Sequence, residues 1–216
     1  MADYRLDMTM MFAMHDAMRR DLAQVTRIAS GVTRSSSDDP AQLLRTALGW
    51  ELFKKFLLVH HQTEDDILWP ALRKAVAGND DQLALADALE EEHGVIEPLL
   101  AAVDAAGADP DGGRGRFADI VDELAGQLGA HLTHEEANGL TLIDAALPAE
   151  RWQHFAAVHG QRLTPDAATY MPWLLSHHGP DELARALEKF PPPFANAFRE
   201  QWAPAFAARG DLWNGR

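Results

Sequence analysis

The sequence predicts an all-α protein built on an antiparallel four-helix bundle. Apolar residues recur at spacings of three and four along most of the chain, and β-branched residues are sparse. No hairpin turn stands between runs of alternating apolar residues. Four long periodic segments are separated by three loops, which is typical of an antiparallel bundle.

The first two predicted helices are separated by the loop SGVTRSSSDDP. The first helix covers residues 7–29 and carries one apolar stripe at helical spacing, formed by Met8, Met11, Phe12, His15, Met18, Leu22 and Val25. At the end of the loop, Asp39 is suited to the N-cap and Pro40 to the first helical position. The second helix covers residues 40–76, and we expect Pro70 to kink or interrupt it.

The third predicted helix covers residues 80–106 and the fourth covers residues 116–146. The segment GADPDGGRG between them is the clearest loop in the sequence. Residues 148–216 contain shorter helical pieces that are rich in Trp, Phe and Pro. We therefore expect two parts, a four-helix bundle at residues 1–147 and a helical extension at residues 148–216 that packs on the bundle. A lid over a site and a homodimer contact are alternative roles for the extension.

Composition limits the possible partners and metal ligands. The 216 residues are 47% apolar, which is enough for a core, and their formal net charge of −14 argues against nucleic acid and anionic membrane surfaces. The absence of cysteine excludes thiolate metal sites and a cysteine nucleophile. A metal ion would need His, Asp or Glu ligands. No signal-peptide pattern and no run near the roughly 18 apolar residues of a membrane span is present, so we expect a cytoplasmic protein.

Each predicted bundle helix places a histidine on its inward face, and three of them add a glutamate four residues later. Residues four apart lie one turn apart on one helix face. The pairs are His60 with Glu64, His93 with Glu97 and His131 with Glu135, and His15 lies in the first apolar stripe. Burying these groups without a cation would cost several kcal/mol for each unpaired charge. The repetition therefore predicts a metal site in the bundle core.

Other metal sites fit the sequence less well. A ferritin-like site needs a Glu-x-x-His pair on each of two helices; Glu90 and His93 supply one, but Leu128 stands three residues before His131. One tetrahedral zinc needs fewer ligands than the chain offers, so two metal ions fit better. The methionines of the first helix could suggest copper, but methionines at helical spacing usually belong to a core.

Four stretches taken together resemble the hemerythrin-like, or HHE cation-binding, proteins in a bacterial intracellular form. They are His15 with Asp16, HHQTED, EEEHGVIEPLL and HLTHEE, and the resemblance covers residues 8–146. It implies two non-haem iron ions bridged by an oxygen species and two carboxylates. Carried over by position, the terminal ligands would be His15, His60, His93 and His131, and the bridging carboxylates Glu64 and Glu135.

Two positions depart from the oxygen-carrying members of that family. Those proteins have a second histidine one turn after the first on the third helix, where this chain has Glu97. Their last carboxylate lies five residues after the last histidine, which would select Glu136 in place of Glu135. With Glu97 as a seventh ligand the site would favour ferric iron, away from reversible oxygen carriage. For His61 and His134 we expect hydrogen bonding rather than ligation.

The resemblance implies a non-haem diiron protein that binds or reacts with oxygen, peroxide or nitric oxide. A diiron oxidase, oxygenase or catalase-like enzyme is an alternative. A helical interaction module with a purely structural metal is another.

Overall fold

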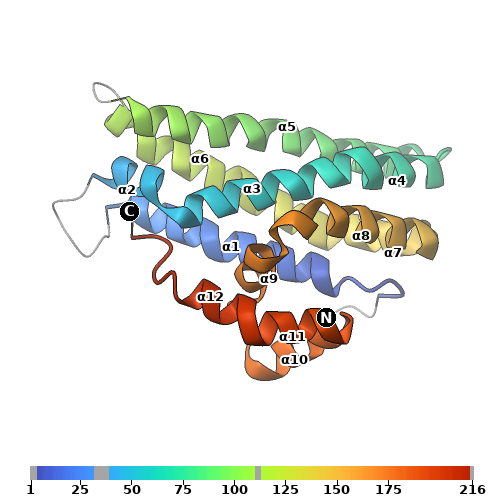
Figure 1. Cartoon of the computed structure of the whole chain (residues 1–216). Coiled ribbons are helices and arrows are strands. Elements are labelled where there is room, and N and C mark those ends of the chain that lie inside the picture. The colour runs from blue at the N-terminus through green and yellow to red at the C-terminus, as the bar shows by residue number, and fades with distance from the viewer. Residues whose placement is uncertain (1–3, 32–38, 110–112, 215–216) are drawn as a thin grey trace.

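The computed structural model describes residues 4–31, 39–109 and 113–214 (Figure 1). Parts of the two predicted loops, residues 32–38 and 110–112, lie outside the described residues. The elements are α1 (Thr9–Ala29), α2 (Pro40–Thr46), α3 (Leu48–Thr63), η1 (Glu64–Leu68), α4 (Trp69–Ala75), α5 (Asp80–Ala108), α6 (Gly113–His134), η2 (Glu135–Gly139), α7 (Leu140–Ala146), α8 (Ala149–Leu163), η3 (Thr164–Asp166), α9 (Ala167–Leu175), α10 (Pro180–Glu188), α11 (Pro192–Ala197), η4 (Phe198–Trp202) and α12 (Ala203–Ala207). Elements η1, η2 and η4 are π-helical turns, and η3 is a 3-10 turn.

The four long helices form a closed bundle (Figure 1). Helix α5 packs against α6, α6 against α1, α1 against α3, and α3 against α5. No strand is present in the part of the chain that the structure describes. The predicted all-α four-helix bundle is therefore confirmed.

The second predicted helix, residues 40–76, is interrupted at two places. Asp39 caps α2 as expected and accepts a hydrogen bond from the Ala41 N–H at 3.2 Å. At Ala47 the backbone is extended, with ψ of 123°, so α2 and α3 are separate helices. The π turn η1 ends at Leu68, two residues before Pro70, whose ring would clash with the preceding turn of a regular α-helix. The expected disturbance at Pro70 is thus a π turn rather than a break.

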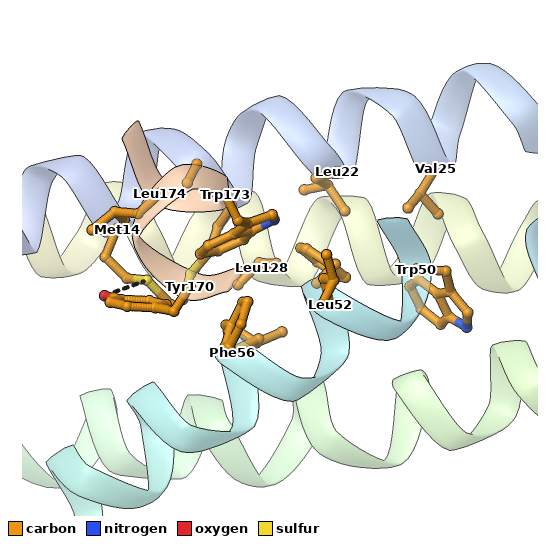
Figure 2. Packing of buried hydrophobic residues seen from close by; sticks show 14 of the residues in the cluster. Met14, Leu22, Val25, Trp50, Leu52, Phe56, Leu128, Tyr170, Trp173 and Leu174 are labelled. Carbon is orange, nitrogen blue, oxygen red and sulfur yellow. Dashed lines mark hydrogen bonds between the residues drawn. The ribbon is translucent and has the colours of Figure 1, made fainter. Parts of the chain in front are cut away.

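Helices of the extension pack directly on the bundle. Helix α8 contacts α3, and α9 contacts α1. Figure 2 shows Tyr170 and Trp173 of α9 beside Phe56 of α3, and their ring centroids lie 5.0 and 4.8 Å from that of Phe56. Residues 149–213 therefore share an apolar core with both ends of the bundle: Trp152 and Phe155 pack at one end, and Tyr170 and Trp173 pack at the other.

Two apolar clusters fill the bundle, and a layer of buried polar side chains separates them. On α1, Met11 belongs to one cluster, Met18 belongs to the other, and His15 lies between them. On α5, Leu89 and Ile96 flank His93 in the same way. Among the described residues, no helix has both the length and the apolar character that a membrane span requires.

Candidate metal centre

The polar layer consists of five histidines and two glutamates that are almost completely inaccessible to solvent. None of the seven is more than 2% exposed; they are His15, His60, His61, Glu64, His93, His131 and Glu135. Each of the four bundle helices, α1, α3, α5 and α6, contributes at least one of these histidines. A protein interior tolerates so many ionisable groups only when they have partners or hold a cation.

These side chains form two groups with the spacing of metal ligands. The first group is His15, His60 and Glu135, and the second is His61, His93 and His131. Within each group, one ligand atom of every residue lies within 4.8 Å of the others. Imidazole nitrogens and carboxylate oxygens are ligands for zinc and for iron alike.

Glu64 and Glu135 each reach from one group to the other. The two Glu64 oxygens lie 3.2 Å from His60 Nε2 and 3.6 Å from His93 Nε2. Glu135 Oε2 lies 3.2 Å from His15 Nε2 and 3.8 Å from His131 Nε2. Each glutamate therefore stands where a carboxylate could bridge two metal ions.

Three carboxylates at the edge of the layer fix the orientation of three histidines. His15 Nδ1 is 2.9 Å from Glu136 and His93 Nδ1 is 2.7 Å from Asp65. His131 Nδ1 is 2.8 Å from Glu92. An Nδ1–H that donates to a carboxylate leaves the Nε2 lone pair directed into the centre, which is the usual arrangement of histidine ligands.

Many polar atoms of the layer have no hydrogen-bond partner inside the protein. They are Nε2 of His15, both ring nitrogens of His60 and His61, and both carboxylate oxygens of Glu64 and Glu135. Nε2 of His93 and Nε2 of His131 face each other at 3.2 Å, although each ring directs its Nδ1 to a carboxylate. Buried polar groups are ordinarily paired. Convergent lone pairs and carboxylates of this kind fit two cations.

The ionisation of the metal-free layer is dominated by burial. Burial, together with the charge of Glu135, raises the pKa of Glu64 well above its usual range. Burial also lowers the pKa values of His60 and His61. Burial alone would lower the pKa of His15, but the carboxylate of Glu135 raises it to about 9. Without metal, a proton on Glu64 and a second proton on His15 thus reduce the excess negative charge of the two buried glutamates. Metal binding must release such protons.

Both glutamates of the layer begin a π-helical turn, Glu64 in η1 and Glu135 in η2. Gly139, at the end of η2, makes room for this arrangement. A Cβ atom there would lie 2.9 Å from Leu89 Cδ1 and 3.1 Å from Glu135 Cγ. π turns inside α-helices occur frequently at functional sites.

The structure brings together six of the seven ligands predicted from the sequence and leaves one outside. The six are His15, His60, Glu64, His93, His131 and Glu135. Glu97 is half-buried on α5 and belongs to neither group. The ligand assignment itself remains a prediction. His61, which was not among the predicted ligands, lies in the second group.

The two neighbouring histidines for which hydrogen bonding was predicted differ from each other. His134 does make a hydrogen bond, from Nδ1 to Glu92 at 2.7 Å. For His61 the prediction is wrong, because neither ring nitrogen has a hydrogen-bond partner. Its ring instead stacks on His93 with centroids 3.9 Å apart, and it lies inside the second group.

Comparisons with known proteins agree with this geometry. The family model of the hemerythrin HHE cation-binding domain matches residues 7–143, well over half of the chain. No curated protein and no solved structure matched the chain. The matched residues contain all seven side chains of the buried layer and the carboxylates that orient them. The chain therefore belongs to the hemerythrin HHE cation-binding family.

Proposed function

We propose that the chain is a non-haem diiron protein whose centre binds and reacts with dioxygen or hydrogen peroxide. The observation that carries the proposal is the pair of buried glutamates that each reach both histidine groups. A single metal ion would need only one group. Two ions would use both groups and would give the buried carboxylate oxygens partners.

The proposed ligands are five histidines and two glutamates. His15 and His60 would hold one ion, and His61, His93 and His131 would hold the other. Glu64 and Glu135 would bridge the two ions. This set differs from the sequence-based set in the exchange of Glu97 for His61.

The two ions would differ in the number of protein ligands. With both glutamates counted, the first ion would have four protein donors and the second would have five. Iron commonly takes six ligands, so the first ion would keep more positions for an exogenous ligand. Iron with an open position supplies redox chemistry toward dioxygen or peroxide.

The surrounding residues hold the histidines in place. Glu136, which orients His15, is itself bonded to Arg19 at 2.6 Å. Burial would raise the pKa of Glu136, but hydrogen bonds from His15 and Arg19 lower it to about 2. An ionised Glu136 keeps the His15 proton on Nδ1 and the Nε2 lone pair available to metal.

The proposal can be tested by anaerobic loading of the protein with ferrous iron and exposure to dioxygen or peroxide. We expect a new absorption band and consumption of the oxidant. His60→Ala should abolish the reaction, because it removes a ligand from the ion with open positions, whereas His154→Ala on the exposed face of α8 should leave it unchanged. Binding of a redox-inert metal alone, with no reaction of the iron-loaded protein, would refute the proposal.

A further inference from the structure

A cavity of about 610 Å³ lies between the bundle and the extension. Its walls come from α1 and α3 of the bundle and from α8, α9 and the segment around α11. His60 forms part of the wall, so the cavity extends to the side of the layer where the first histidine group lies. Such a volume is within the range of small-molecule sites.

The lining of this cavity is mainly apolar. Its one acidic and one basic side chain have charges that cancel. Met11, Met14 and Phe155 contribute buried apolar surface. The acidic and basic lining residues, Asp7 and Lys189, form an ion pair with each other. A charged ligand would lose its hydration without gaining a counter-charge from the side chains of this lining.

On the side of the wall that the extension supplies, His159 has a buried ring nitrogen without a partner. Nε2 of His159 is buried and makes no hydrogen bond. Its ring lies edge-on to His60, with centroids 5.5 Å apart, and stacks on Phe155 at 6.0 Å. Nearby, the Tyr170 hydroxyl donates only to the sulfur of Met14 at 3.7 Å (Figure 2). A ring nitrogen without a partner can form a hydrogen bond with a ligand. A ligand hydroxyl could donate this hydrogen bond to the nitrogen or accept it from an N–H.

The size of the cavity limits the ligand further. A cavity of about 150 Å³ holds one benzene molecule. The observed cavity is about four times larger, so it has room for a molecule of two rings or for an aliphatic chain of similar bulk.

We propose that this cavity binds an uncharged, largely apolar organic molecule with a hydroxyl group, and that the hydroxyl is bonded by His159 beside His60. The extension would then form the part of the site that binds the organic molecule, because α8 supplies His159 and both α8 and α9 line the cavity. Binding itself depends only on the cavity. Its position next to a metal ion rests on the proposed function.

The direct test uses three ligands of one shape, namely 2-naphthol, naphthalene and naphthalene-2-sulfonate. Calorimetry reports binding to the full chain, and a change in tryptophan fluorescence that is lost in Trp152→Phe reports binding at the cavity, because Trp152 lines it. We expect saturable one-to-one binding of 2-naphthol. Naphthalene should bind about threefold to tenfold more weakly, which is the usual effect of one hydrogen bond, and the sulfonate should not bind measurably.

Two kinds of variant locate the ligand. His159→Phe keeps a ring but removes the bonding atom, so 2-naphthol should bind no better than naphthalene, and His154→Phe on the exposed face of the same helix is its control. Gly160→Phe and Ala167→Phe enlarge wall residues and should abolish binding. Gly126→Phe is the matched control, because a Cβ atom added at Gly126, like one added at Gly160, would meet no other atom within 4 Å.

Equal binding of the sulfonate, or unchanged 2-naphthol affinity in His159→Phe and both wall variants, would overturn the proposal. Iron content is measured on the same samples. A protein that binds 2-naphthol at the cavity but holds no iron would refute the proposed function and keep the cavity assignment. A protein that holds two iron ions but binds none of the three ligands would refute the cavity assignment and leave the proposed function standing.

Discussion

Replacement of Glu92 by alanine should weaken metal binding without removing any proposed ligand. The two Glu92 oxygens accept hydrogen bonds from His131 Nδ1 at 2.8 Å and from His134 Nδ1 at 2.7 Å. Although burial would raise it, these bonds lower the pKa of Glu92, so the carboxylate is ionised. Without Glu92 the His131 ring would be free to change tautomer or rotate, and its Nε2 lone pair would no longer be fixed toward the metal.

The expected loss follows from one charge-assisted hydrogen bond to a buried ligand. Such a bond contributes about 1.5–3 kcal/mol. Because the Glu92 side chain is 32% exposed, water screens part of this energy and we take about 1.5–2.5 kcal/mol. At 1.36 kcal/mol for each factor of ten, this equals about a 10- to 70-fold weaker metal affinity.

The affinity is measured by competition with a chelator under anaerobic conditions. Glu91→Ala serves as the matched control, because Glu91 is the neighbouring exposed residue on α5. Circular dichroism should show that both variants keep the helical fold. An affinity of Glu92→Ala equal to that of Glu91→Ala would refute the role of Glu92 in orienting His131.

Three further predictions concern stability and geometry. Removal of metal should lower the melting temperature, because the layer then keeps unpaired groups in the core; equal melting of the metal-free and loaded forms would contradict this. In the metal-free protein His15 has a pKa raised to about 9, so its contribution to stability is complete below about pH 6.5 and is lost as the pH rises through 9. The melting temperature of the metal-free protein should fall over this pH range, and in His15→Gln it should fall less. Gly139→Ala should weaken metal binding, since the new Cβ would lie 3.1 Å from Glu135 Cγ; Gly94→Ala, where the Cβ meets open space, should not, and equal affinities would argue against the packing role of Gly139.

The bundle and most of its centre could be predicted from helical periodicity. Inward histidines with a glutamate one turn later follow from the 3.6-residue repeat. His61 could not be predicted in this way, because adjacent residues on a helix point about 100° apart. The buried layer is wide enough for both neighbours, so His60 belongs to the first group and His61 belongs to the second.

Spacing alone also could not separate Glu97 from the two glutamates of the centre. All three stand four residues after a histidine. Glu64 and Glu135 begin π turns, whereas Glu97 lies in the continuous helix α5. The same spacing therefore places a carboxylate in the layer only on the two helices that contain a π turn.

The partners of the histidines and the cavity depend on tertiary packing. Glu92 is 39 residues from His131 in sequence, and Glu136 is 121 residues from His15. No local pattern relates such pairs. His159 likewise reaches His60 only because α8 folds back on α3.

The most direct test of the two-ion centre is the number of iron ions bound per chain in the parent protein, in His61→Ala and in Glu97→Ala. The geometry predicts two ions in the parent and in Glu97→Ala, because Glu97 belongs to neither group. It predicts fewer than two in His61→Ala, which loses a ligand of the second group. One ion per chain in the parent, or loss of iron from Glu97→Ala but not from His61→Ala, would contradict the proposed centre.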